Sequence, residues 1–303
     1  MCYNQQIMKK FGFVSISGRP NVGKSTILNG ILKEKVAIVS PKPETTRDNI
    51  RGILTRKDCQ CVFIDTPGIH RPHDLLGKIM LSRAQSSLME TDIILFVTER
   101  YQAFGKEDQH IRGRLPKSES GKKVILVINK VDKVKNKKLL LPLMKKARDF
   151  YPFDEILPMC AFKDEDLQML LKMIESRLPE GPFHYEKEDL TDKSMEFMIR
   201  EIIREKILGG TYEEIPHSIA VMVEEIKEEK EKVSIYATIF VERTSQKSII
   251  IGAGGTMIKK IKTSARRDLK KLFSKKVSLE LWVKVSDKWK RNPAALRELG
   301  YVD

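Results

Sequence analysis

The stretch that decides the fold of the first half of this chain is Gly18-Arg19-Pro20-Asn21-Val22-Gly23-Lys24-Ser25. It fits the pattern GxxxxGK[ST] of a phosphate-binding loop. The apolar run 11–17 predicts a buried strand before it, and 25–33 predicts a helix after it, which is the context that this motif requires. The glycines allow the backbone to fold around phosphate oxygens, so that N–H groups and the helix N-terminus face the anion. We expect Lys24 to contact the terminal phosphates and Ser25 to bind Mg²⁺.

A second motif, Asn129-Lys130-Val131-Asp132, indicates which base is bound. It follows the apolar run 124–128, which is typical of a parallel strand buried on both faces, and ligands bind at the C-terminal ends of such strands. The Asp132 carboxylate can accept hydrogen bonds from the ring N–H and the exocyclic amine of guanine. Adenine lacks that donor pair and would leave the carboxylate unpaired, which disfavours an ATPase. Asn129 is expected to tie loops together, and the stem of Lys130 to lie along the base.

Two segments between these motifs predict the remaining phosphate and metal contacts. Asp65-Thr66-Pro67-Gly68 follows an apolar run, so that Asp65 can hold Mg²⁺ through water and the amide of Gly68 can meet the γ-phosphate. The polar loop 43–48 (Pro-Glu-Thr-Thr-Arg-Asp) offers a second hydroxyl ligand to Mg²⁺. Thr46 is the preferred choice for this ligand and Thr45 is the alternative.

The order GRPNVGKS, PETTRD, DTPG and NKVD resembles that of Era-type GTPases, and the resemblance extends over nearly the whole chain. It implies a P-loop G domain, with a mostly parallel sheet and helices on both faces, followed by an α+β type II KH domain. It also implies that the chain binds GTP or GDP with Mg²⁺ and hydrolyses GTP slowly. The residues that it assigns to hydrolysis are Lys24, Thr46, Asp65 and Gly68, with Ser25, Thr46 and Asp65 as metal ligands. The residues that it assigns to nucleotide binding are Gly18, Arg19, Pro20, Asn21, Val22, Gly23, Lys24, Ser25, Thr26, Asp65, Thr66, Pro67, Gly68, Ile69, Asn129, Lys130, Val131, Asp132 and Ala161.

Three positions bear on hydrolysis and base binding, and two of them depart from the related GTPases. Ile69 stands where Ras-like enzymes have a Gln that orients the attacking water, so another group must hold that water. Asn21 matches the position that helps to bind K⁺ in relatives with this kind of switch, which leaves stimulation by K⁺ open. Cys160 stands where relatives usually have Ser, so its role stays open beside Ala161. No arginine finger is identifiable, and Arg47 and Arg71 are expected to be solvated surface residues.

Composition indicates two domains and a polyanionic partner. The chain has 303 residues and a net charge of +15, and residues 243–291 carry +12 of it, with fifteen Lys and Arg against three acidic residues. Such a concentration is typical of nucleic-acid binding, with a solvated basic surface as the alternative.

The sequence has no apolar run of about 18 residues and no signal-peptide pattern, so we expect neither a membrane span nor secretion. The four cysteines are expected to be reduced thiols, with Cys59 and Cys61 on opposite faces of a strand.

The second half of the chain predicts an RNA-binding module. We place the G domain at 1–180, a linker at 181–192 and the KH domain at 193–303. Helices are expected at 191–208, 256–273 and 288–300, and strands at 219–223, 233–241 and 277–285, with a charged turn at 224–232. Gly209-Gly210 is expected to end the first of these helices, Trp282 to lie in the core and Trp289 to anchor the last helix.

Gly252-Ala253-Gly254-Gly255 satisfies the GxxG pattern of KH domains, in which close backbone approach clamps single-stranded nucleic acid. Era-type relatives usually have Lys where this chain has Ala253, so one phosphate contact is lost. The residues expected to bind RNA are Ile251, Gly252, Ala253, Gly254, Gly255, Lys259, Lys260, Lys262 and Arg266.

The resemblance also implies partners and a place of action. It implies binding to the 3′ end of 16S rRNA during assembly of the 30S ribosomal subunit, by a monomer in the cytoplasm. It further suggests peripheral association with the inner membrane surface. The alternative function is that of an RNA-binding protein whose G domain binds GTP but serves as a structural platform without hydrolysis. The missing Gln at Ile69 keeps that alternative open.

Overall fold

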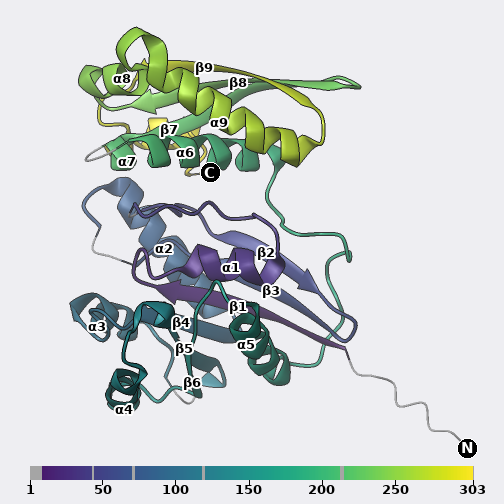
Figure 1. Ribbon diagram of the computed structural model, residues 1–303, viewed down its shortest axis with the longest axis vertical. Helices are drawn as coiled ribbons and strands as arrows, with labels where there is room; N and C mark the ends of the chain where they lie inside the picture. Colours follow the sequence, from purple (N-terminus) through teal and green to yellow (C-terminus); the bar gives the residue numbers. More distant parts are fainter. Residues whose placement is uncertain (1–8, 43, 70–71, 118–119, 212–214, 303) are drawn as a thin grey trace, which may run out of the picture. The chain divides into compact units, whose positions relative to one another are not determined.

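The computed structural model describes residues 9–42, 44–69, 72–117, 120–211 and 215–302 (Figure 1). The chain forms two compact units. The first consists of Met1–Ala37, Thr46–Arg71 and Met80–Asp192, and the second of Ile38–Thr45, Pro72–Ile79 and Lys193–Asp303. Two short segments from the N-terminal half therefore belong to the second unit.

The first unit contains a six-stranded sheet with the strand order β2-β3-β1-β4-β5-β6. All neighbouring strands are parallel except β2 and β3, which are antiparallel. Because β1, β3 and β5 run in the same direction, the phosphate, metal and base motifs that follow them lie at one edge of the sheet. The strands are β1 (Lys10–Gly18), β2 (Ile50–Thr55), β3 (Cys59–Asp65), β4 (Ile93–Glu99), β5 (Lys123–Asn129) and β6 (Glu155–Pro158).

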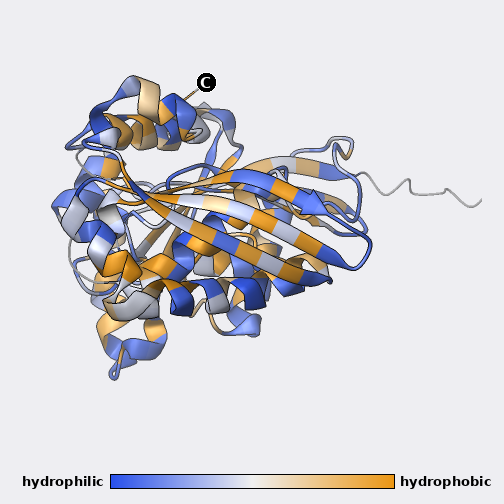
Figure 2. Ribbon diagram, turned by 90° about the horizontal axis from the view of Figure 1, so that it is seen from above, coloured by the Kyte–Doolittle hydropathy of each residue, from blue (hydrophilic) through white to orange (hydrophobic). Residues whose placement is uncertain are grey.

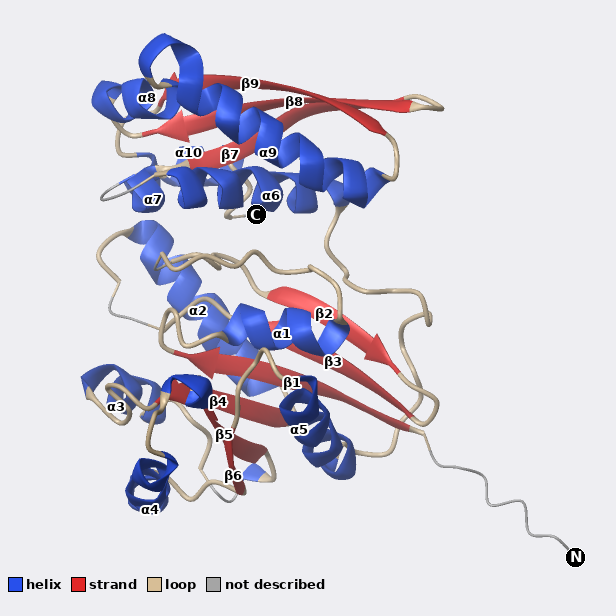
Figure 3. Ribbon diagram, viewed as in Figure 1, coloured by secondary structure: helices blue, strands red, loops and turns tan. Residues whose placement is uncertain are grey.

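Helices cover both faces of this sheet, as predicted (Figure 3). On one face, buried residues of α2, α3 and α4 form a cluster with Ile94 and Phe96 of β4 and Leu126 of β5. On the other, α1 packs against α5, where Gly30 approaches Leu167 so closely that an added Cβ atom would lie 2.8 Å from its Cδ1. The helices are α1 (Lys24–Leu32), α2 (Leu75–Glu90), α3 (Lys106–Arg112), α4 (Leu140–Phe150) and α5 (Asp164–Arg177).

The second unit has the topology expected of the KH module. Its sheet has the order β7-β8-β9, with β7 antiparallel to β8 and β9 parallel to it. Figure 2 shows apolar and polar residues alternating along the long strands, as is typical of a sheet with one face buried. The elements are α6 (Met195–Gly210), α7 (Ile215–Ser218), β7 (Ala220–Glu228), β8 (Lys232–Val241), α8 (Thr244–Ile251), α9 (Thr256–Phe273), β9 (Lys276–Val285) and α10 (Pro293–Glu298).

Several element boundaries differ from those predicted. Helix α6 runs through Gly209 and Gly210 instead of ending before them. A Cβ atom added at Gly210 would lie 3.3 Å from the sulfur of Met257 of α9, so glycine allows the end of the helix to pack closely there. Strand β7 continues to Glu228, which shortens the expected turn. The predicted final helix is interrupted at Asn292, whose side chain accepts from the amides of Ala294 and Ala295 and so begins α10.

Two predictions about side-chain placement were wrong and one was confirmed. Trp282 is 49% exposed and stacks on Tyr236, with ring centroids 6.1 Å apart, instead of lying in the core. Cys59 and Cys61 lie two residues apart on one strand and therefore share a face, where a hydrogen bond between the thiols and burial raise the pKa of Cys61. Trp289 is fully buried and donates to the carbonyl of Ser218 at 2.9 Å, as expected of an anchor.

Within the described ranges, none of the helices combines the length and the apolar character that crossing a bilayer requires.

Candidate nucleotide and RNA sites

The phosphate loop connects β1 to α1, and its glycines permit close contacts that another residue would prevent. A Cβ atom at Gly18 would lie 2.3 Å from the carbonyl oxygen of Val97, and one at Gly23 would lie 2.2 Å from Nδ2 of Asn129. Gly23 also caps α1 with a left-handed φ of 104°. The loop therefore depends on these glycines, as the motif predicted.

Lys24 lies beneath the loop with little exposure to solvent. Its Nζ donates to the carbonyls of Gly18 at 3.1 Å and Arg19 at 2.9 Å. Burial lowers the pKa of Lys24 to about 8; the carboxylate of Asp65 opposes this shift and the charge of Arg19 adds to it. A buried ammonium with a lowered pKa gains most from an anionic ligand, which suits a phosphate contact.

Raising the pH through about 8 should weaken GDP binding, because the free protein then loses the proton of Lys24. Phosphate favours the charged lysine, so the complex keeps this proton and binding above the lowered pKa requires proton uptake. The affinity should fall by up to about tenfold per pH unit. Titration calorimetry on either side of pH 8 measures it. In Lys24→Arg the guanidinium stays charged, so an equal slope in that variant would show that another group is responsible.

Three oxygen-bearing side chains meet beside the loop. The hydroxyl of Ser25 donates to Oδ2 of Asp65 at 2.6 Å, and that of Thr46 donates to the same atom at 3.2 Å. Asp65 is fully buried, and burial raises its pKa although Lys24 and both hydroxyls oppose the shift. Its Oδ1 is also buried and has no hydrogen-bond partner among the residues that the structure describes. This all-oxygen set with an unsatisfied carboxylate oxygen fits Mg²⁺.

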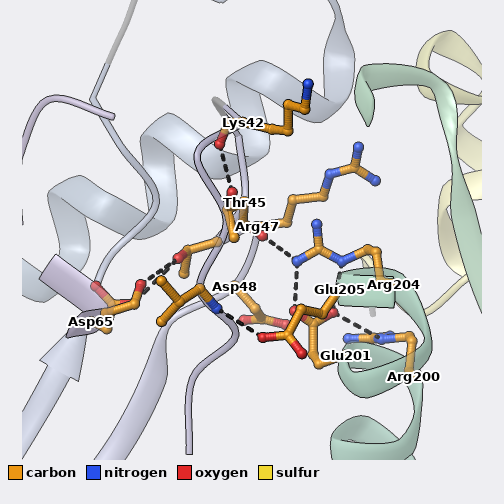
Figure 4. A network of polar contacts seen from close by, with 12 residues as sticks. Lys42, Thr45, Arg47, Asp48, Asp65, Arg200, Glu201, Arg204 and Glu205 are labelled. Atoms are coloured by element: carbon orange, nitrogen blue, oxygen red, sulfur yellow. Dashed lines mark hydrogen bonds and ion pairs between the residues drawn. The ribbon is translucent and has the colours of Figure 1, made fainter. Parts of the chain in front are cut away.

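The structure separates the two threonines that the sequence left as alternatives. The hydroxyl of Thr45 donates to the carbonyl of Lys42 at 2.6 Å (Figure 4). The hydroxyl of Thr46 instead lies 3.2 Å from Oγ of Ser25. Only Thr46 thus points its hydroxyl into the cluster with Asp65.

The segment after Asp65 passes close to the phosphate loop. A Cβ atom at Gly68 would lie 2.9 Å from the backbone nitrogen of Pro20, so that glycine is needed there too. Ile69 is 1% exposed and packs in the core cluster that contains Leu88 and Phe96. Its side chain therefore cannot orient a water molecule, and that task falls to other groups.

The base motif is held by contacts that link separate loops. Asn129 donates to the carbonyl of Val22 at 2.8 Å and accepts from the amide of Ala161 at 3.1 Å, as predicted. Nζ of Lys130 lies 2.7 Å from the carboxylate of Glu99, a partner that the motif did not reveal. The phosphate loop and the base loop thus form one connected site.

Cys160 belongs to this site although its role was open. Burial and the nearby carboxylate of Asp132 raise the pKa of Cys160, and its amide donates to Asp166 at 2.7 Å. The thiol therefore stays neutral and can donate to Asp132, as the hydroxyl of a serine would. The exposed Asp132 is left at the mouth of the site, where a base can reach it.

A buried ion pair fixes the backbone of the phosphate loop. Nε of Arg19 donates to Oδ1 of Asp108 at 2.8 Å, and Oδ2 of Asp108 accepts from Thr98 at 2.9 Å and from the amide of Phe104 at 2.8 Å. Asp108 is fully buried, and Arg19 is nearly so. Sequence reasoning missed Asp108, because it lies on α3 outside every motif.

Asp108→Asn should lower the free energy of unfolding by about 3 kcal/mol, because it leaves the buried charge of Arg19 without its counter-ion. Urea unfolding without nucleotide measures this. The matched control is Asp287→Asn, whose carboxylate is 75% exposed and 4.0 Å from Lys288, with an expected change below about 0.5 kcal/mol. Equal losses in both variants would refute a structural role for the buried pair.

One of the two arginines considered as possible fingers differs from expectation. Arg47 is 2% exposed, so the prediction of a solvated surface residue was wrong. Its carbonyl accepts from Arg83 of α2 at 3.4 Å, and Asp48 pairs with the same guanidinium, which draws this segment against α2. Arg71 lies outside the described residues.

The GxxG loop joins α8 to α9 through left-handed glycines. Gly252, Gly254 and Gly255 have φ values of 74°, 57° and 77°. A Cβ atom at Gly252 would lie 2.8 Å from the backbone nitrogen of Met257, whereas Gly254 and Gly255 face open space. The exposed backbone at Gly254 and Gly255 carries no side chain, which allows phosphates to approach closely.

The basic residues predicted to bind RNA fall into two groups. Lys259 and Lys260 are exposed in the first turns of α9, directly after the loop. Lys262 instead pairs with Glu280 of β9 at 2.9 Å, and Nε of Arg266 donates to the carbonyl of Val277 at 3.2 Å. The first pair is therefore better placed to meet a phosphate.

Comparisons with known proteins identify both domains. A family model for 50S ribosome-binding GTPases matches residues 13–130, and one for the KH domain matches residues 214–290. GTPase Era of Clostridium tetani is 47% identical over 97% of this chain and 99% of that protein. GTPase Era of Leuconostoc citreum is 46% identical over 96% of each chain.

Two solved structures are similar over nearly the full length. One is a variant of Aquifex aeolicus Era bound to GDP and AlF4⁻, and the other is Era in complex with MgGDPNP and nucleotides 1506–1542 of 16S ribosomal RNA. Each has a TM-score of 0.93 and 40% identity, and each match covers 97% of this chain and 100% of the other.

Proposed function

This chain belongs to the Era family of GTPases, and from that premise we propose that GTP in its G domain controls binding of the 3′ end of 16S rRNA by its KH domain during assembly of the 30S subunit. As a member of this family it hydrolyses GTP to GDP and phosphate with Mg²⁺. The observation that carries the hydrolytic part is the buried cluster of Ser25, Thr46 and Asp65 beside Lys24, with Oδ1 of Asp65 lacking a partner among the described residues.

The chain's own groups bind and orient the triphosphate. Bound Mg²⁺ supplies charge neutralisation for the β- and γ-phosphates. Ser25 and Thr46 would hold it directly, and Asp65 directly or through water. Lys24 places its ammonium on the terminal phosphates, and the amide of Gly68 donates to the γ-phosphate. These positioned charges act where negative charge develops in the transition state.

The RNA part rests on the second unit. The related Era structure contains nucleotides 1506–1542 of 16S rRNA. In this chain the open GxxG backbone, the exposed Lys259 and Lys260, and the net charge of +12 over residues 243–291 supply the chemistry that single-stranded RNA requires.

The proposal is tested by GTP hydrolysis and fluorescent GDP binding, with and without a single-stranded RNA that copies the 3′ end of 16S rRNA. Slow basal turnover that this RNA stimulates supports the coupled function. Guanine binding without turnover, in either condition, favours the structural platform instead, the alternative to which the buried Ile69 points. A scrambled RNA of equal length controls for charge.

Potassium is the proposed additional cofactor, held with the help of Asn21 of the phosphate loop. This proposal is supported by the apolar side chain of Ile69, which leaves charge stabilisation and water placement to other groups.

We also propose that the protein is a monomer in the cytoplasm and associates peripherally with the inner membrane surface, which the basic charge supports. Analytical ultracentrifugation tests the oligomeric state, and vesicle sedimentation tests the membrane association.

Ala253→Lys should restore the phosphate contact that this chain lacks in its GxxG loop. The RNA affinity should rise at low salt, and the slope of log K against log[salt] should steepen by about 0.7, the value for one phosphate of a single strand. Fluorescence anisotropy between about 50 and 200 mM salt measures the slope. Ala294→Lys adds the same charge on α10; an equal effect there would mean that net charge alone is responsible.

A further inference from the structure

Two segments of the second unit adjoin, along the chain, the two loops that we expect to respond to the nucleotide and call the switches: the loop around Thr46 and the segment that begins at Asp65. Ile38–Thr45 ends one residue before the metal-ligand candidate Thr46, and Pro72–Ile79 follows the segment that begins at Asp65. Ile38 is 3% exposed within the hydrophobic core of the second unit, and Asp74 lies 3.5 Å from Lys290. Both switches are therefore covalently continuous with segments that pack in the second unit.

Helix α6 holds the first of these segments by its backbone. Arg204 is fully buried, and its Nη2 donates to the carbonyl of Thr45 (Figure 4). Glu201, one helical turn earlier, orients the guanidinium, accepting from Nε at 3.0 Å and from Nη2 at 2.5 Å. The amide of Val39 also donates to Glu205 at 3.3 Å. Because Glu201 fixes the orientation of the guanidinium, Arg204 positions one peptide carbonyl, that of Thr45.

The same segment reaches the surroundings of the GxxG loop. Residues 39–41, the end of α6 and the start of α9 line a cavity of ≈ 280 Å³ that includes Gly210, Met257 and Lys260. Met257 lies against both Gly210 and Gly252, the first glycine of the loop. A continuous set of contacts within the second unit thus runs from Thr45 to the candidate RNA-binding backbone.

We propose that Arg204, oriented by Glu201, is a positioning residue that transmits the nucleotide state to the KH module through the carbonyl of Thr45. This inference rests on the proposed function. While Thr46 binds Mg²⁺ in the triphosphate state, the neighbouring carbonyl of Thr45 stays within hydrogen-bond distance of Arg204. After hydrolysis the loop is released, and the buried guanidinium loses this acceptor. Because coupling is reciprocal, RNA binding favours the held loop in turn.

The experiment compares the RNA affinity of the full chain with GDP and with a non-hydrolysable GTP analogue, using the single-stranded RNA named above. The quantity compared is the RNA affinity with the GTP analogue divided by that with GDP, and typical couplings correspond to ratios of about 5 to 150. In Arg204→Ala this ratio should lie within about twofold of one, and RNA should no longer stimulate kcat. GDP affinity should stay within about threefold of that of the unmodified chain, since Arg204 does not line the phosphate loop.

Arg204→Ala leaves Glu201 buried without its partner and could unfold the protein. A second variant therefore separates loss of coupling from loss of the fold. Arg204→Met combined with Glu201→Gln removes both charges at similar volume, and circular dichroism verifies its fold. The exposed Arg291→Ala is the matched control and should keep the ratio of the unmodified chain. A folded double variant that also keeps this ratio overturns the inference.

The unmodified chain separates failure of this inference from failure of the proposed function. If it neither binds the RNA nor hydrolyses GTP, the proposed function itself fails. If it does both but its RNA affinity is the same in the two nucleotide states, the function stands and the inference about Arg204 is overturned.

Discussion

Asp132→Asn should lower the affinity for GDP by about 10⁴-fold and create measurable affinity for xanthosine diphosphate. We expect the carboxylate to accept two hydrogen bonds from guanine, whereas an asparagine amide would replace one acceptor with a donor that faces another donor. Xanthine presents an oxygen in place of the exocyclic amine, so the variant pairs with it. The rest of the site stays intact, because Asn129 and Ala161 connect the loops without using Asp132.

Competition of fluorescent GDP with GDP, ADP and xanthosine diphosphate measures this exchange of specificity. Asp149→Asn, an exposed change of the same kind on α4, should leave all three affinities unaltered. A loss of GDP binding without gain of xanthosine diphosphate binding would mean that the variant distorts the loop. Unchanged GDP binding would refute the assignment of Asp132 to the base.

Thr46→Ala should reduce kcat for GTP hydrolysis by about 10²- to 10³-fold, an effect of the size seen when one preorganised transition-state contact is removed. Thr46 and Ser25 approach the same oxygen of Asp65. We therefore expect loss of the Thr46 hydroxyl to remove a direct Mg²⁺ ligand that would hold the loop in the triphosphate state. GDP affinity should change less than kcat, since Ser25 and Lys24 remain. Single-turnover hydrolysis at several Mg²⁺ concentrations measures both effects.

Thr45→Ala is the informative comparison for this experiment. The side chain of Thr45 contacts the carbonyl of Lys42 and not the metal cluster, while the carbonyl of residue 45 is retained by the variant. We expect its kcat within about threefold of that of the unmodified chain, a change of less than about 1 kcal/mol in the barrier. A larger loss in Thr45→Ala than in Thr46→Ala would reverse the assignment of the two residues.

Local patterns predicted much of this molecule because they reflect local geometry. Each such pattern depends on the backbone conformation of only a few neighbouring residues. Examples are the apolar–polar alternation of β8, the amphipathic repeat of α9 and the glycines of both loops. Helix α9 therefore occurs at its predicted bounds, Thr256–Phe273. Predicted boundaries were wrong where a residue's type did not decide its conformation, as at Gly210, which lies within α6 and packs closely against Met257.

The sequence by itself determined the fold class, the phosphate and base motifs and the family, since each depends on residue types at short, fixed spacings. Only the tertiary structure decided which partners meet across long separations. Arg19 and Asp108 are 89 positions apart and Arg204 and Thr45 are 159 apart, and no local period relates such pairs. Burial is likewise a property of the packed chain, which is why Arg47 proved buried and Trp282 exposed, against expectation from their types.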